Sequence, residues 1–299
     1  MAKKKNKKSN ILGIIIIILA IIYNLYTALD TNNPVESPVP NFAASADNLI
    51  IHYIDVGQAD SALITLNDKA MLIDAGDSKD DNLVVNYLKT QGITNLDYVV
   101  ATHPHEDHIG GMDSIIRNFE IDTFLMPNVV HDSPQFDDMV TALENKKLQF
   151  TSPKVGDTYT LGEAKFTILS CKTDDLEDLN ASSIVLRLEY GTQSYIFCGD
   201  AIKENEYSMM DSGLTLKSTV IKIAHHGSTT SSLEKFILAV DPEIAIIPCG
   251  KGNSYGHPHE KIVKRLNRLG IKMYRTDLNG TIVVISDGVT TTVTTEKGE

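Results

Sequence analysis

A cluster of three histidines and one aspartate within six residues constrains this chain more than any other feature. Residues 102–111 read Thr-His-Pro-His-Glu-Asp-His-Ile-Gly-Gly, and they follow an apolar run at 98–101 that predicts a buried strand. Imidazole nitrogens and carboxylate oxygens are common ligands for zinc, manganese and iron. So many polar donors at the end of a strand do not contribute to a hydrophobic core. The sequence therefore predicts a metal site there.

The spacing within this cluster predicts two separate ions. In an extended segment, residues two apart point the same way, so His103 and His105 are expected to bind a first ion. Asp107 and His108 follow where the chain turns toward a Gly-Gly pair. These two side chains are therefore expected to face a second ion.

Other candidate ligands also follow apolar runs that predict strands. Asp200 ends one such run, and the pair His225 and His226 ends another. In two-metal hydrolases the ions lie about 3.5–4 Å apart, and a bridging carboxylate offsets their repulsion. We assign the bridge to Asp200 and expect His225 to join the second ion, although the sequence alone does not decide between His225 and His226. The expected mechanism uses hydroxide formed between the ions, with Asp107 and Asp200 as the catalytic carboxylates.

Four further side chains are expected near this site. His226 and Ser228 are predicted to bind substrate, the latter through its hydroxyl at a helix start. His257 is predicted either to protonate a leaving group or to bind a phosphate, the alternative being a surface turn with incidental histidines. Asp74 ends another apolar run and is expected to accept hydrogen bonds from backbone amides near the site.

The N-terminus predicts a membrane anchor. Residues 1–10 carry five lysines and form a predicted cytoplasmic tail, and residues 11–29 are almost continuously apolar. As a helix this stretch would span roughly 28 Å, close to the hydrocarbon thickness. The lysines favour the cytoplasmic side, so we expect a single-pass protein of the cell membrane with the rest outside. The alternative is a cleaved signal peptide and a secreted protein. Residues 30–48 predict a proline-rich linker, and 49–296 a hydrolase domain.

The charge of the external part is strongly negative. With the five tail lysines set aside, 22 basic residues face 39 acidic ones, a net charge of −17. This balance argues against a broad basic groove for nucleic acid. It leaves open phosphodiester substrates that bind mainly through metal.

Periodicity predicts a strand-rich α+β chain. Strands are expected at 49–55, 61–66, 69–74, 97–101, 121–125, 165–169, 183–190, 193–198, 218–223, 243–248, 271–275, 281–286 and 289–295. Helices are expected near 80–90, 111–118, 135–146, 203–210, 231–240 and 259–269. Turn pairs at 67–68, 191–192 and 287–288 predict hairpins. Together these patterns predict two mixed sheets with helices outside, the first half running to about residue 170.

At these residues the chain resembles the metallo-β-lactamase superfamily. Residues 103–108 match its HxHxDH signature. Five other segments, taken in order, resemble the soluble hydrolase domain of ComEC-type competence DNA-internalisation proteins; they are 54–61, 74–76, 198–200, 225–228 and 255–258. The resemblance covers about residues 49–293. It implies an αββα four-layer sandwich with a two-metal site between the sheet edges.

The chain departs from this pattern in two ways. The ComEC-type domain is attached to a large multi-helix channel, whereas this sequence predicts one spanning segment, so no DNA channel is expected from it. Many superfamily members also supply another histidine to the first ion before the position of Asp200. Here residues 179–184 hold no histidine. The first ion is therefore expected to be held loosely, which favours manganese or easy loss of zinc.

Residues and resemblance together predict a membrane-anchored, extracytoplasmic phosphodiesterase or nuclease with two divalent ions, Zn²⁺ or Mn²⁺. Its phosphodiester substrate would be DNA, a wall polymer or a small diester, and a partner in a competence machinery is left open. A carbonyl-bond hydrolase of the lactamase or thioesterase type is one alternative. The missing histidine near Asn180 argues against it, because those branches usually retain it. A non-catalytic binding domain is the other alternative.

Overall fold

The computed structural model describes residues 47–80, 82–174 and 176–298. All of these residues belong to one compact unit. The predicted tail, the predicted anchor and nearly all of the predicted linker lie outside the described residues. Within the described ranges, every helix is too short or too polar to cross a membrane.

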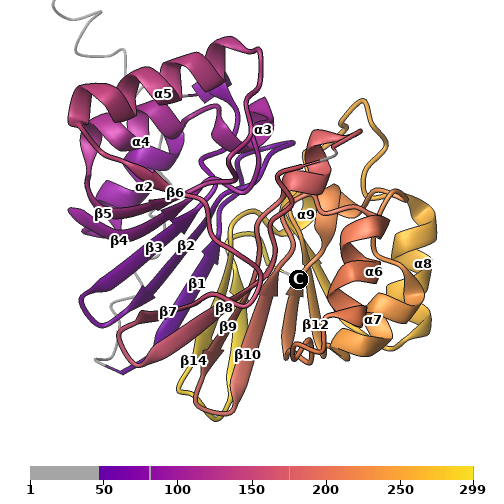
Figure 1. Cartoon of the computed structure of the whole chain (residues 1–299). Helices are drawn as coiled ribbons and strands as arrows, with labels where there is room; N and C mark the ends of the chain where they lie inside the picture. Colours follow the sequence, from indigo (N-terminus) through magenta and orange to yellow (C-terminus); the bar gives the residue numbers. More distant parts are fainter. Residues whose placement is uncertain (1–46, 81, 175, 299) are drawn as a thin grey trace, which may run out of the picture. The chain divides into compact units, whose positions relative to one another are not determined.

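The described residues form fifteen strands in two mixed sheets (Figure 1). The first sheet runs, in spatial order, through β15 (Thr291–Thr295), β14 (Ile282–Ser286), β1 (Leu49–Tyr53), β2 (Ala62–Leu66), β3 (Lys69–Ile73), β4 (Asn95–Val100), β5 (Glu120–Leu125) and β6 (Phe150–Thr151). The second sheet runs through β13 (Lys272–Arg275), β12 (Ile244–Ile247), β11 (Val220–Lys222), β10 (Gln193–Phe197), β9 (Val185–Tyr190), β8 (Ala164–Ser170) and β7 (Thr158–Leu161).

Helices cover the outer face of each sheet. The first sheet packs against α2 (Leu83–Thr90), α4 (Met112–Asn118) and α5 (Pro134–Lys146). The second sheet packs against α6 (Lys203–Asp211), α7 (Glu234–Val240) and α8 (Glu260–Arg268). Two single turns, α3 (Glu106–Ile109) and α9 (Thr276–Asn279), sit in loops. The result is the helix–sheet–sheet–helix order that the sequence analysis predicts (Figure 1).

The alternation of side chains along β1 explains why this strand is buried on both faces. Its residues Leu49, Ile51 and Tyr53 point into the core between the two sheets. His52 points the other way, and its Nδ1 lies 2.8 Å from the hydroxyl of Tyr87 in α2. Burying each large apolar side chain contributes about 1.5–3 kcal/mol, so the two layers lock together through such strands.

All thirteen expected strands are present, with small shifts at their ends. The short strands β6 and β7, and the single turns α3 and α9, are additions that periodicity did not predict. The expectation that the first half ends near residue 170 is wrong. β7 and β8 already belong to the second sheet, and β14 and β15 return to the first, where β14 pairs with β1.

The three predicted hairpins are confirmed as antiparallel pairs. Two of them, β9–β10 and β14–β15, belong to different sheets but touch at their turns. A Cβ at Gly191 would collide with the carbonyl oxygen of Gly288, and both glycines have positive φ. The backbone N–H of Thr192 donates to that same oxygen at 2.6 Å. Glycine at both turns therefore allows the two sheets to meet at this end.

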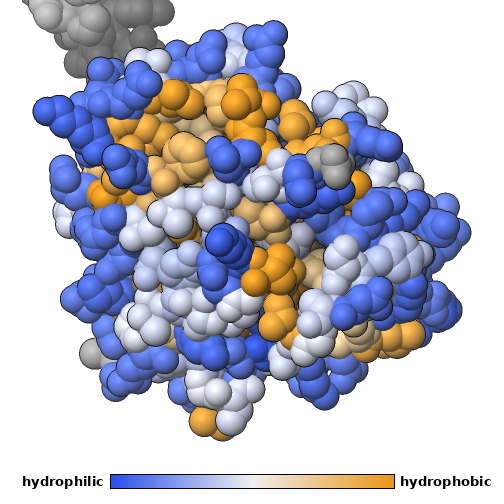
Figure 2. Space-filling view, in the orientation of Figure 1, coloured by the Kyte–Doolittle hydropathy of each residue, from blue (hydrophilic) through white to orange (hydrophobic). Residues whose placement is uncertain are grey.

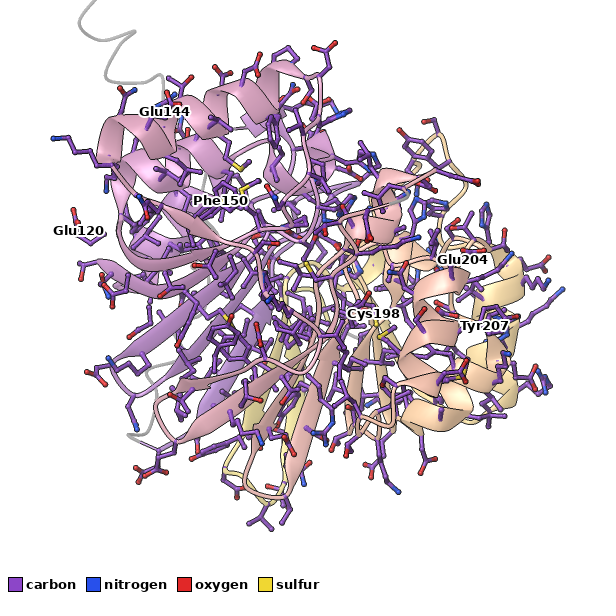
Figure 3. The ribbon with its side chains drawn as sticks, in the orientation of Figure 1. Glu120, Glu144, Phe150, Cys198, Glu204 and Tyr207 are labelled. Carbon is purple, nitrogen blue, oxygen red and sulfur yellow. The ribbon has the colours of Figure 1, made fainter. Side chains whose placement is uncertain are left out.

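Hydrophilic residues cover much of the face seen in Figure 1, and apolar residues gather on the part of it beside α5 (Figure 2). Phe150 of β6 lies in this area and is 43% exposed (Figure 3). Cys198, in contrast, follows directly after β10 and is buried between the second sheet and its helices (Figure 3). It stands two residues before Asp200, so the chain leaves a rigid core directly into the loop that bears this carboxylate.

Candidate metal centre

The predicted ligands meet because the strands that precede them are parallel. β3 is parallel to β4 in the first sheet, and β10 is parallel to β11 in the second. The carboxyl ends of parallel strands lie at one edge of a sheet, where ligands are usually bound. The loops after these four strands carry Asp74, the 102–111 cluster, Asp200 and the pair at 225–226.

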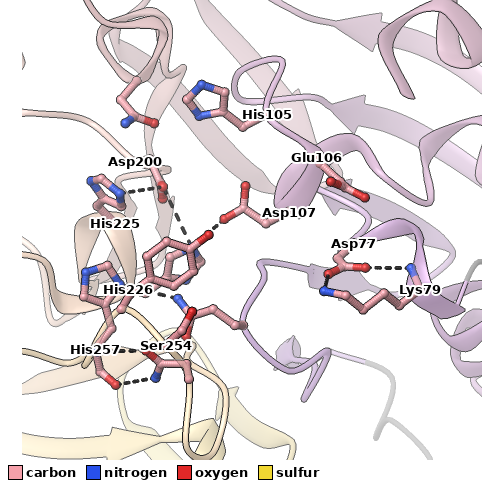
Figure 4. Close-up of a pocket in the computed structure, with 14 residues that line it drawn as sticks. Asp77, Lys79, His105, Glu106, Asp107, Asp200, His225, His226, Ser254 and His257 are labelled. Carbon is pink, nitrogen blue, oxygen red and sulfur yellow. Dashed lines mark hydrogen bonds and ion pairs between the residues drawn. The ribbon is translucent and has the colours of Figure 1, made fainter. Parts of the chain in front are cut away.

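Four side chains form the centre of the site. Each of them offers a ligand atom within 4.8 Å of the others, and they are Asp107, His108, Asp200 and His226. The Nε2 of His226 lies 3.1 Å from Oδ2 of Asp107, and the Nε2 of His108 lies 3.2 Å from Oδ1 of Asp200. Figure 4 shows Asp107, Asp200 and His226 turned toward one another from separate loops.

The surroundings of the buried His108 ring suit a metal ligand. Its Nδ1 lies 2.7 Å from Oδ2 of Asp74, so a neutral ring donates there and leaves a lone pair on Nε2. That lone pair faces Oδ1 of Asp200, and neither atom has a hydrogen bond among the described residues. Two acceptors face each other stably only around a proton or a metal ion.

The buried imidazoles and carboxylates of this group shift one another's pKa values in opposite directions. Burial lowers the pKa of His108, but Asp200, Asp74 and Asp107 raise it well above its usual range. Burial raises the pKa of Asp200, but the imidazoles of His108 and His226 lower it well below its usual range. Metal ions replace such protons when they bind. The mixed nitrogen and oxygen donors fit a pair of divalent cations, zinc or manganese.

The predicted first-ion pair lies beside this group. Nε2 of the buried His103 is 3.0 Å from Nδ1 of His105, so one ion can contact both atoms. The rings of His103 and His108 are 4.1 Å apart between centroids. Burial, followed by the charge of His108, lowers the pKa of His103 well below its usual value, which keeps it neutral for metal binding.

Asp74 supports the cluster through Thr102. Its Oδ1 accepts the backbone N–H of Thr102 at 2.8 Å, and its Oδ2 accepts the Thr102 hydroxyl at 2.8 Å. The amide contact has the form that the sequence analysis expects of Asp74. The contact with His108 was not expected, and it fixes the orientation of a ligand ring.

The two histidines after β11 diverge because their backbone is left-handed. His225 and His226 both have a φ of 51°, within the short helix η3 (Ala224–Gly227). His226 is buried, with its Nδ1 3.0 Å from the carbonyl oxygen of Pro248, and its Nε2 faces the centre. The Nδ1 of His225 lies 2.9 Å from the hydroxyl of Thr230. The structure thus brings His226, rather than the expected His225, into the four-residue group.

His225 still borders the site, because its Nε2 lies 3.7 Å from Oδ2 of Asp200. The remaining predicted substrate-binding residues, His257 and Ser228, differ in their position relative to the cleft. His257 borders the cleft above the metal centre, with its Nδ1 3.4 Å from the amide nitrogen of Gln58. Ser228 is buried, and its Oγ accepts the hydroxyl of Thr230 at 3.0 Å. Ser228 does not border the cleft.

The cleft itself has a volume of about 620 Å³ (Figure 4). It is open to solvent and polar. Its walls include His105, Asp107, Asp200, His225 and His226 near the metal centre. Lys79 and Tyr255 border it further out. An anionic group that enters this cleft would reach the side chains that could hold metal ions.

Sequence reasoning missed two buried charges beneath the site. Lys222 at the end of β11 is 3% exposed, forms an ion pair with Asp60 and donates to the carbonyl oxygen of Gly199 at 3.2 Å. Asp60 forms a second acidic group with Asp74 and His108. The ammonium of Lys222 therefore neutralises charge directly below the ligands. A lysine at the end of an apolar strand was the available signal.

Comparison with known proteins places these motifs in one family. Residues 54–251 match the Metallo-beta-lactamase superfamily. The chain is 32% identical over 250 residues to "ComE operon protein 3" of Bacillus subtilis, which covers 78% of this chain and 32% of that protein. It is 30% identical over 232 residues to "Competence protein ComA" of Neisseria gonorrhoeae, covering 76% of this chain and 31% of that protein. The chain spans about a third of the length of these curated relatives.

Solved structures agree on the fold. The metallo-beta-lactamase fold protein YhfI from Bacillus subtilis superimposes with a TM-score of 0.52 at 11% identity, covering 80% of this chain and all of that one. At this identity the likeness concerns the fold alone. Together with the sequence matches, it shows that the chain belongs to the metallo-beta-lactamase superfamily and is related to the competence proteins.

Proposed function

We propose that this chain is a metal-dependent hydrolase that cleaves phosphodiester bonds. The observation that carries the proposal is the position of Asp200 between two sets of imidazoles. Its Oδ1 faces His108, and its Oδ2 lies 3.8 Å from Nε2 of His226. His108 and His226 are the expected donors of the second ion, and the charge of Asp200 also acts on His103 and His105, the expected donors of the first. A carboxylate placed near both donor sets suits a bridge between two ions.

Two divalent ions at such a site supply hydroxide near neutral pH and stabilise the charge of a phosphoryl group. The residues of the chain then set the geometry. Asp200 and Asp107 hold the donors of both loops together, and the open cleft admits the diester. His257 borders the path of the substrate. Burial, followed by the neighbouring imidazoles, lowers the pKa of His257 to about 4, so the neutral ring can donate one N–H to a phosphate oxygen.

Two features at the outer part of the cleft support a nucleic-acid substrate. Tyr255 is 67% exposed and stacks on His257 with an interplanar angle of 20°. An exposed aromatic face beside a phosphate site suits a nucleobase. Lys79 adds a cation, partly offset by its ion pair with Asp77. The names of the competence relatives point the same way, whereas the net charge of −17 favours a wall polymer or small diester.

The test is metal analysis combined with turnover of linear DNA, circular DNA, bis-p-nitrophenyl phosphate and nitrocefin. We expect turnover of a phosphodiester that is lost on chelation and restored by Mn²⁺ or Zn²⁺. Nitrocefin turnover at a comparable rate would favour a carbonyl-bond hydrolase instead. Less than one ion per chain after careful preparation would favour a binding domain. A salt titration of DNA binding with a slope near zero would argue against the nuclease version.

We further propose that residues 11–29 anchor the hydrolase domain outside the cell membrane. The lysines at the N-terminus and the apolar stretch that follows support this placement. A partner in a competence machinery is part of the same proposal. Membrane fractionation with protease accessibility tests the anchor. A mature N-terminus at or after Ala46 would show that the segment is removed and the protein secreted.

A further inference from the structure

The number and type of protein donors at the first ion decide which metal that position favours. His103 and His105 supply nitrogen atoms, and the oxygen that Asp200 is proposed to share with the second ion would be a third donor. Zinc in proteins takes about four ligands and manganese takes more. Three protein ligands and one solvent molecule satisfy a catalytic zinc ion, so a fourth protein donor near these side chains would favour a metal that takes more ligands.

The segment that contains η2 (Leu179–Ser182) is fixed between the two ligand loops. Just after it, the backbone N–H of Ile184 donates to the carbonyl oxygen of Thr102 at 2.9 Å. The hydroxyl of Ser183 accepts the backbone N–H of Asp200 at 3.1 Å. A Cβ at Gly199 would lie 3.2 Å from both Ser183 and Thr102. The three segments that contain these residues are therefore closely packed. This packing positions η2 beside the first-ion donors.

Asn180 is the residue of η2 that reaches the cleft. Its side chain is only 7% exposed, yet it borders the same cleft as His105 and Asp200. Its Oδ1 is buried and has no hydrogen bond among the described residues. Buried amide oxygens almost always accept a hydrogen bond or contact a cation. This oxygen is therefore available to contact a cation in the cleft that His105 and Asp200 also border.

We propose that the side-chain oxygen of Asn180 is a ligand of the first ion and that it biases this position toward Mn²⁺ over Zn²⁺. An amide oxygen is a harder donor than an imidazole nitrogen, and hard donors favour manganese. The inference rests on the proposed two-ion site but not on the identity of the substrate. His131 is the competing donor, since its ring lies 5.8 Å from that of His105, but it does not border the cleft.

The test uses the full chain, stripped by a chelator and titrated separately with MnCl₂ and ZnCl₂ against a competing indicator. For Asn180→Ala we expect loss of the weaker Mn²⁺ site or a fall of about tenfold or more in its affinity. Asn180→Asp, which keeps the shape and adds charge, should bind Mn²⁺ more tightly than the wild type. Asn180→His should shift the ratio of Zn²⁺ to Mn²⁺ affinity toward zinc by a similar factor. Ser254→Ala, at an exposed position in the same cleft, should leave both titrations unchanged.

The possible failures are distinguishable. A wild-type chain that binds neither metal overturns the two-ion site itself. A wild-type chain that binds two ions, with unchanged Mn²⁺ and Zn²⁺ affinities in all three Asn180 variants, overturns only the role of Asn180. Loss of the first site in His131→Ala, with none in Asn180→Ala, would assign the donor to His131. Should Asn180→Ala fail to fold by circular dichroism, the aspartate and histidine variants decide the outcome.

Discussion

The loop after β4 and the loop after β11 both bring imidazoles to one cleft, but they orient them with different backbone geometry. In the first loop His105 is extended, with φ −78° and ψ 149°, and the rule that alternate residues share a face places it beside His103. In the second loop, two consecutive left-handed residues send His226 inward and His225 toward Thr230. A spacing rule holds only where the backbone conformation that it assumes is present.

Asp200 contacts imidazoles of both loops. Of the proposed variants, its replacement is expected to have the largest effect on activity. Asp200→Ala takes away the carboxylate that faces imidazoles of both loops. We expect turnover to fall by about three orders of magnitude or more and one or both ions to be lost. Steady-state rates and metal content measure this. Wild-type rates in the variant would break the proposed link.

The second loop predicts unequal roles for its two histidines. His226→Ala removes an imidazole 3.1 Å from Asp107 and should cost about 100-fold in metal affinity or turnover. His225→Ala removes a ring that only borders the site, and we expect a loss of about tenfold or less. The two single variants are compared by metal titration and rate. A larger loss in His225→Ala would restore the original assignment of His225 as the ligand.

A carboxylate at 2.7 Å orients the ligand ring of the first loop, whereas a backbone carbonyl oxygen orients that of the second. Asp74→Asn keeps the size of the side chain but weakens its contacts with His108 and Thr102. We expect metal affinity to fall by about 10-fold to 100-fold with little change in secondary structure. Thr102→Val, which removes one of the two Thr102 contacts, provides a milder matched variant. Unchanged affinity in Asp74→Asn would mean that the loop holds its own geometry.

The buried carboxyl group of Glu206 binds the backbone that follows the second loop. Its titration is expected to change the free energy of unfolding. Glu206 in α6 accepts the backbone N–H of Leu233 at 2.8 Å and contacts that of Ser232. Burial raises its pKa from 4.5 to about 7. Its folded-state pKa is thus above the unfolded value, so the stabilisation is complete below about pH 4.5 and disappears as the pH rises through 7.

We therefore expect the free energy of unfolding to fall by on the order of 1–2 kcal/mol between about pH 5 and 7. Urea unfolding of the metal-free protein at several pH values measures it. Glu206→Gln removes the titrating group, so its pH dependence over this range should be flatter. An equal slope in the variant would assign the pH dependence to other groups.

Local sequence patterns predicted much of the fold. Particular elements show which features such patterns cannot predict. Strands such as β1 were predicted because apolar residues mark them clearly. β6 has two residues and exposed side chains, so no periodicity reveals it. The return of β14 and β15 to the first sheet is a long-range pairing, and nothing in the residues 282–295 themselves signals their neighbour.

The site shows the same division. The cluster at 103–108 was informative because many donors stand close together along the chain. Asp60 and Lys222 meet only in the folded protein, from the loop after β1 and the end of β11. The buried oxygen of Asn180 is likewise defined by what surrounds it. Ligands that cluster along the sequence can be predicted from it. The groups that orient and neutralise them can be identified only from the tertiary structure.

The pairing of β1 with β14 has a consequence for biogenesis. β1 is the first strand of the domain, and one of its two neighbours lies more than two hundred residues later in the chain. During synthesis one edge of β1 stays open until residues 282–286 have emerged. Closing so long a loop is slow, and an open edge invites pairing with other chains. The pairing of β14 therefore protects this edge of β1 only late in synthesis.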